Sequence, residues 1–148
     1  MITLWYRPPE ILLGQKDYDT AADIWSAACI MCEMKLGKPL IMGDCEIHQI
    51  FKIFQMFGTP SETSWPGISK LPDYKKTFPK YHPDNMKSLG SNFGNFGDLD
   101  PKFLDLVSQM LILDPKKRMN GHDILNHVFF PPINEKNSPI SMRVYLHQ

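Results

Sequence analysis

The sequence predicts an all-α fold, and three observations lead to this prediction. Helix-capping residues recur along the chain, each followed by apolar residues at helical spacing. No segment of useful length alternates apolar and polar residues as a half-buried strand would. No internal repeat divides the 148 residues, and a chain of this length can form one domain with a sizeable core. We therefore expect one compact helical domain.

The first long helix is expected over residues 21–36. Thr20 and Asp23 match a capping box, in which the Thr20 hydroxyl accepts from the Asp23 N–H and the Asp23 carboxylate reaches back to the Thr20 N–H. Gly37 can take the left-handed conformation that ends the helix. Residues 24–32 are apolar on nearly every side. This pattern is typical of a helix in the middle of a domain.

A second helix is expected after Gly43, with Asp44 as its N-cap. Gly58 and Pro60 follow the apolar run and should end the helix. The residues at helical spacing that should form its buried stripe are Ile47, Ile50, Phe51, Phe54 and Phe57.

Two more helices are expected near the C-terminal end. Asp100 is an N-cap followed by Pro101, and proline at the first helical position loses no hydrogen bond. This helix should end at residues 114–115, an Asp-Pro pair, and a short helix over residues 121–127 should follow Asn120. The apolar stripe of the longer helix comprises Phe103, Leu104, Val107, Met110, Leu111 and Leu113.

Residues 66–97 contain several prolines and glycines, which favours an extended surface segment with short turns. The glycines at positions 90, 94 and 97 lack the spacing of a phosphate-binding loop, and Asp98 and Asp100 would repel phosphate. We predict no nucleotide site in this segment. Beyond residue 131, the polar tail 132–148 should be loosely held.

Composition narrows the possible classes of function. Sixteen Lys and Arg balance sixteen Asp and Glu, so no global charge favours nucleic acid or an anionic membrane. No apolar run is long enough to span a membrane and no signal-peptide pattern is present, so we expect an intracellular protein, in nucleus or cytoplasm. Cys29 and Cys32 should be small core residues of the first helix, and His122 and His127 are a weak pair. We predict no metal site.

The order of several short motifs resembles one protein family. Arg7-Pro8-Pro9-Glu10 is close to the Ala-Pro-Glu signature that ends the activation segment of protein kinases. It is followed by DIWSAACIMCEM, GDCEIHQIFKIFQMFGTP, WPG, LPDYKKTFPK and HVFFP. Together these resemble the C-terminal part of the C-lobe of a cyclin-dependent serine/threonine kinase over about residues 1–131. The resemblance implies a partial kinase domain that begins at the end of the activation segment.

The resemblance implies roles for the first residues of the chain. Thr3 looks like the hydroxyl that supports the catalytic loop. Leu4, Trp5 and Tyr6 resemble the platform under the substrate residue that follows the phosphoacceptor, which is proline in this family. Arg7 looks like the arginine that braces this platform through backbone carbonyls. Ordinary packing of an aromatic pair and an arginine is the alternative interpretation.

Two structural roles and one docking surface are also implied. Glu10 and Arg118 resemble an ion pair that ties the activation-segment end to the loop before the last helices. Asp23 is similar to an aspartate that holds the catalytic loop, although its role here is as a helix cap. The residues that resemble the docking surface for a small Cks-type adaptor are Asp44, Glu46, Ile47, His48, Phe78 and Lys80. His48 departs from the acidic residue common at its position.

The sequence lacks the motifs that perform phosphoryl transfer. It contains no glycine-rich phosphate loop, no His-Arg-Asp and no Asp-Phe-Gly, and Phe96-Gly97-Asp98 has the wrong order. We therefore expect the N-lobe and catalytic loop to be absent, no cofactor in this chain, and no activity from it alone. ATP and magnesium belong to the full-length family. Cyclin, the adaptor and Ser/Thr-Pro proteins are the implied partners, and a non-catalytic half-kinase acting as scaffold or competitor is the alternative function.

Overall fold

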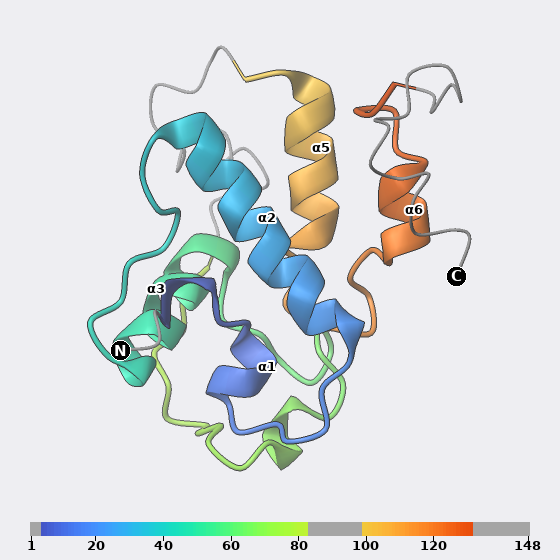
Figure 1. The fold of residues 1–148 in the computed structure, drawn as a ribbon. Coiled ribbons are helices and arrows are strands. Elements are labelled where there is room, and N and C mark those ends of the chain that lie inside the picture. Colours follow the sequence, from blue (N-terminus) through green and yellow to red (C-terminus); the bar gives the residue numbers. More distant parts are fainter. Residues whose placement is uncertain (1–3, 83–98, 132–148) are drawn as a thin grey trace, which may run out of the picture.

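The computed structural model describes residues 4–82 and 99–131, and this part of the chain is helical without a strand (Figure 1). In chain order the elements are η1 (Leu4–Tyr6), α1 (Pro9–Leu12), α2 (Thr20–Leu36), α3 (Glu46–Phe57), η2 (Ile68–Lys70), α5 (Pro101–Met110) and α6 (Gly121–Leu125). The all-α prediction is confirmed for the described residues. The catalytic-loop support expected of Thr3 and the tail 132–148 lie outside them.

Helix α2 begins one residue earlier than expected. Its N-cap is Asp19, whose side chain accepts from the Ala21 N–H at 2.8 Å. Thr20 is therefore the first helical residue, and Asp23 lies one position beyond the place that a capping box requires. The predicted cap by Thr20 and Asp23 is wrong, since Asp19 also satisfies the preference for a short polar side chain. At the other end Gly37 takes the expected left-handed cap, with φ +68°.

Helix α3 also differs from the prediction at its start. Its N-cap is Cys45, which makes no side-chain capping bond. Asp44 instead lies 2.9 Å from the Nδ1 atom of His48, so its predicted capping role is wrong. The buried face is rotated as well: Ile47 is 48% exposed, and the buried residues are Gln49, Ile50, Ile53 and Phe54. A polar glutamine therefore occupies a position that apolar periodicity would assign to the surface.

The two C-terminal helices have the expected caps. Asp100 accepts from the Lys102 N–H at 2.9 Å at the start of α5, and Asn120 accepts from the Asp123 N–H at 3.0 Å at the start of α6. Helix α6 ends at Leu125, two residues before the predicted end. These short polar side chains each satisfy a backbone donor that a helix start leaves without an intrahelical partner.

Helix α2 runs diagonally through the centre of the fold, with α5 along one side and η1, α1 and α3 near its other side (Figure 1). One core joins these elements, and its largest fully buried side chains include Trp25, Phe54 and Phe103. Yet α2 also exposes apolar side chains: Met34 is 79% exposed and Ile30 is 48% exposed. One apolar face of this helix therefore remains in solvent, although the sequence predicts a helix in the middle of the domain. Among the described helices, none has the length and hydropathy needed to cross a bilayer.

Glu62 stabilises the turn that leads into η2. Its carboxylate accepts from the backbone N–H groups of Gly67 at 2.8 Å and Ser69 at 2.9 Å. A hydrogen bond from the Ser69 side chain, followed by these backbone bonds, lowers the pKa of Glu62 to about 2. The Glu62 carboxylate therefore bonds the segment after α3 to the start of η2.

Candidate functional site

The residues expected to form the substrate platform lie in one short helical turn, η1, between α2 and α3. Leu4, Trp5 and Tyr6 are each half-buried, so part of every side chain is accessible. The Tyr6 hydroxyl donates to the Glu33 carboxylate, and this bond raises the pKa of Tyr6 above its ordinary value. The Tyr6 carbonyl accepts from the Ser26 hydroxyl at 2.8 Å. Helix α2 therefore holds Tyr6 at both its side chain and its backbone.

Arg7 has a different partner from the one expected. Its Nη1 atom donates to Oε1 of Glu46 at 2.6 Å, whereas the resemblance implied bonds to backbone carbonyls. The side chains are 25% and 64% exposed, respectively. A carboxylate is a stronger acceptor for a guanidinium than a neutral carbonyl, and Glu46 stands in the first turn of α3, within reach of Arg7. Arg7 therefore links the end of η1 to α3.

Trp5 is attached to α3 and to the segment before it. Its indole Nε1 donates to the Gly43 carbonyl at 3.0 Å, and its own carbonyl accepts from the side-chain amide of Gln49 at 3.3 Å. The same amide accepts from the Gly43 N–H at 2.6 Å through Oε1. The backbone of the platform is therefore fixed by a buried side chain of α3.

A buried ion pair anchors the helix that follows the platform. Arg118 Nη1 lies 2.7 Å from Glu10 Oε1, and Nη2 lies 2.9 Å from Glu10 Oε2. The two side chains are 0% and 1% exposed. The guanidinium also lies over the ring of Trp25, at 5.2 Å from the ring centroid. The expected pairing of Glu10 with Arg118 is present, and it joins α1 to the loop between α5 and α6.

The six residues expected to dock an adaptor are only partly brought together. Glu46, Ile47 and Phe78 line one pocket of about 290 Å³. Phe78 is 6% exposed and packs edge-to-face against Phe51, so it forms a wall of this pocket rather than a free side chain. The remaining three do not line the pocket: His48 is half-buried, and Asp44 and Lys80 are exposed.

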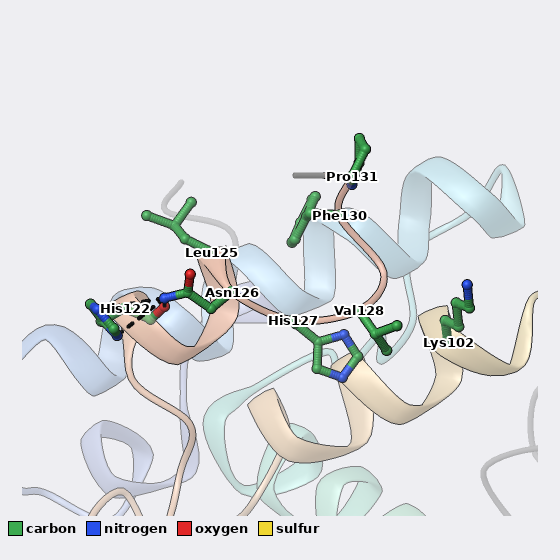
Figure 2. A pocket seen from close by; sticks show the side chains of 8 residues that line it. All are labelled: Lys102, His122, Leu125, Asn126, His127, Val128, Phe130 and Pro131. Atoms are coloured by element: carbon green, nitrogen blue, oxygen red, sulfur yellow. Dashed lines mark hydrogen bonds between the residues drawn. The ribbon is translucent and has the colours of Figure 1, made fainter. Parts of the chain in front are cut away.

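A separate pocket of about 840 Å³ lies between α5 and α6, away from η1. In Figure 2, His122 and Asn126 lie at one end of it and Lys102 of α5 lies at the other. His127 is oriented by two bonds: its Nε2 lies 2.9 Å from Asp105 Oδ2, and its Nδ1 accepts from the Phe129 N–H at 3.1 Å. His127 therefore holds the chain after α6 against α5.

The cysteines and candidate metal ligands give no site. Cys29 and Cys32 are buried in α2, and burial raises the pKa of both thiols, that of Cys32 to about 12. Cys45 is exposed. Within residues 4–82 and 99–131, no group of three or more His, Cys, Asp or Glu side chains is placed to hold a metal ion.

Sequence reasoning missed the residues whose hydrogen bonds fix the platform in place. These are Ser26 and Glu33 of α2, Gly43 in the segment before α3, and Gln49 in the first turn of α3. Gln49 gave no signal in the sequence, because it lies outside the apolar stripe that the helical spacing predicts. Ser26 and Glu33 gave none, since their partners are set by tertiary packing.

Comparison with known proteins identifies the family. The sequence matches the protein kinase domain over residues 1–130. It is also similar to Cyclin-dependent kinase 1 of Encephalitozoon cuniculi (strain GB-M1), with 46% identity over 130 residues. The alignment covers 88% of this chain and 42% of that kinase, so the chain spans less than half the length of this relative. The chain therefore belongs to the protein kinase family, on its cyclin-dependent branch.

Proposed function

We propose that residues 1–131 form the C-terminal part of the C-lobe of a cyclin-dependent serine/threonine kinase and supply its substrate platform. The observation that carries this proposal is the attachment of η1, whose backbone is bonded both to α2 through Ser26 and to α3 through Gln49. A turn fixed on two sides presents Leu4, Trp5 and Tyr6 in a constant arrangement. Such preorganisation is what a surface needs to select the residue that follows the phosphoacceptor.

We further propose that the chemistry requires residues outside this sequence. Phosphoryl transfer depends on positioning ATP and magnesium, a lysine and a catalytic aspartate. The described residues hold no cluster of candidate metal ligands, and the whole sequence has no His-Arg-Asp or Asp-Phe-Gly. The residues present do not fit a magnesium-nucleotide site. Thr3 would support the catalytic loop from the platform side.

The partners proposed are proteins with Ser/Thr-Pro sites, a cyclin and a Cks-type adaptor. The pocket that contains Glu46 and Ile47 supports an adaptor site, because Ile47 is an apolar side chain exposed at the start of a helix. His48 and Asp44 face each other at 2.9 Å beside this pocket. His48→Asp should strengthen adaptor binding by restoring the acidic residue of the family. Titration of both variants with a Cks protein tests this, and no binding by either folded variant contradicts it.

The central test uses a chimaeric kinase, in which residues 1–130 replace the aligned region of the Encephalitozoon cuniculi kinase. With cyclin and ATP, the chimaera should phosphorylate a Ser-Pro peptide and prefer it to a Ser-Ala peptide. The 148-residue chain alone should give neither phosphorylation nor an ATP-dependent thermal shift. Activity from the short chain that Thr3→Ala abolishes would contradict the proposal.

The exposed apolar face of α2 favours this function over that of a free-standing scaffold. Met34 and Ile30 are one turn apart on this face and are 79% and 48% exposed, respectively. Soluble monomers rarely leave contiguous apolar surface uncovered. The isolated chain should therefore self-associate and bind hydrophobic dyes. A monomeric, dye-silent chain with one cooperative unfolding transition would instead support the scaffold.

A further inference from the structure

Gln49 is a buried glutamine whose side chain is bonded to the backbone of two other segments. It is 0% exposed. Its Oε1 accepts from the Gly43 N–H at 2.6 Å, and its Nε2 donates to the carbonyls of Trp5 and Ile41, each at 3.3 Å. Buried polar groups are costly unless hydrogen-bonded, so the amide and these three backbone groups depend on one another.

Gly43 completes this arrangement because only glycine fits beside Gln49. A Cβ atom on Gly43 would lie 2.5 Å from both the backbone N and the Cα of Gln49, which no real contact allows. The Gly43 carbonyl in turn accepts from the Trp5 indole at 3.0 Å. Trp5, Gly43 and Gln49 are therefore linked in a closed ring of contacts, which we call the Gln49 clamp.

An amide is the functional group that this position requires. Gln49 faces one N–H donor and two carbonyl acceptors, and a side-chain amide supplies one acceptor and a two-proton donor. A glutamate would keep the bond from Gly43 but set a carboxylate oxygen against two carbonyl oxygens. A leucine of similar volume would leave all three backbone groups without a partner.

We propose that Gln49 is a positioning residue for the substrate platform and determines how strongly the platform prefers proline after the phosphoacceptor. This inference rests on the proposed function. The clamp fixes the Trp5 carbonyl, which belongs to the peptide unit between Trp5 and Tyr6, in the middle of the platform. The second link from α3, Arg7 to Glu46, is exposed at 25% and 64%, and exposed ion pairs contribute little. Gln49 is therefore the main attachment of the platform to α3.

The test measures peptide kinetics in the chimaeric kinase. The variants are Gln49→Glu and Gln49→Leu, and the matched control is Gln55→Ala, an exposed glutamine of the same helix. We expect each Gln49 variant to raise KM for the Ser-Pro peptide about tenfold, with kcat within about twofold, because losing the Gln49 bonds displaces the platform that binds the peptide and not the groups that perform the chemistry. The preference for Ser-Pro over Ser-Ala should fall by a similar factor. Gln55→Ala should change neither quantity.

Hydrogen exchange in the same proteins separates a local effect from unfolding. Amide protection should fall in residues 4–7 and 41–43 of the Gln49 variants, while α5 stays protected. Gly43→Ala disrupts the clamp at Gly43 instead of Gln49, because its Cβ atom would clash with the Gln49 backbone, and it should give the same pattern of protection. If Gln49→Leu fails to fold, Gln49→Glu and Gly43→Ala still decide the question.

The possible failures are distinguishable. A wild-type chimaera that is active without any preference for proline contradicts the proposed platform itself. A wild-type chimaera with the preference, and Gln49 variants that retain both the preference and KM, overturns the inference about Gln49 alone. Equal loss of kcat on both peptides also overturns it, because that result indicates general destabilisation.

Discussion

The Glu10–Arg118 pair offers the sharpest test of how the fold is held together. Arg118 makes more than the two bonds to Glu10: its Nη1 donates to the Ala21 carbonyl at 2.6 Å, and its Nε donates to the Ile112 carbonyl at 3.0 Å. The side chain has no exposed surface. One guanidinium therefore joins α1, the start of α2 and the loop after α5.

The expected free-energy changes follow from these contacts. Glu10→Ala leaves a buried cation without its carboxylate, which costs about 3 to 5 kcal/mol of unfolding free energy. Arg118→Met leaves a buried carboxylate and also removes the bonds to its two nearest backbone carbonyls, those of Ala21 and Ile112, at about 1 kcal/mol each, so about 5 to 7 kcal/mol is expected. The double variant buries no charge and should lose only about 2 to 4 kcal/mol, for the carbonyls and imperfect packing. Either single variant removes much of a typical stability of about 5 to 15 kcal/mol.

The assay is urea denaturation of the chimaeric kinase and its three variants, followed by tryptophan fluorescence, since Trp25 lies against Arg118. The double variant should be more stable than Arg118→Met alone, and it should fold even if that single variant does not. A double variant whose loss equals the sum of the two single losses would show that Glu10 and Arg118 are not coupled. Arg118→Met preserves a long apolar stem over Trp25, which limits the effect to charge and hydrogen bonds.

Three other outcomes are expected. The pKa of Glu62 is lowered to about 2, against an ordinary value of 4.5. The Glu62 carboxylate therefore stabilises the fold fully above pH 4.5, and this contribution is lost as the pH falls toward 2. Glu62→Gln should lower the urea midpoint at pH 7 but not at pH 2. Iodoacetamide at pH 8 should label Cys45 alone in the native chain, and it should label Cys29 and Cys32 only after unfolding. If mass spectrometry detects rapid labelling of all three cysteines in the native chain, the burial of Cys29 and Cys32 is contradicted. Met34→Lys should reduce self-association of the isolated chain in sedimentation experiments, because Met34 is 79% exposed, and unchanged association would place the contact elsewhere.

The helices were predictable because their signals are local. Asp100 and Asn120 cap α5 and α6 as the sequence predicts, and Gly37 ends α2. The error at the start of α2 is a shift of one position where two short polar residues compete: Asp19 precedes Thr20, and both favour an N-cap. Local preference does not discriminate between such neighbours, so the packing of the whole helix determines which of them becomes the N-cap.

Short local motifs predicted individual residues of the site but not their contacts with distant parts of the chain. The residues of η1 and the Glu10–Arg118 pair were identified by resemblance, but the partner of Arg7 was not, because Glu46 is 39 residues away in sequence. Gln49 was assigned no role, because the predicted apolar stripe of α3 places it on the surface, whereas the structure buries it. Contacts between distant segments depend on how α2 and α3 pack, and no local pattern encodes that arrangement.

The platform lies between two anchors of different kinds, and this difference predicts separable effects. Downstream, Glu10 fixes α1 to Arg118 through a fully buried ion pair that also involves the start of α2. Upstream, Gln49 fixes Trp5 through neutral hydrogen bonds to α3. Breaking the ion pair leaves a charge in the core, so its cost should appear mainly as lost stability. Breaking the Gln49 clamp leaves backbone groups of a half-buried turn without partners, so its cost should appear mainly in the conformation of η1 and thus in KM.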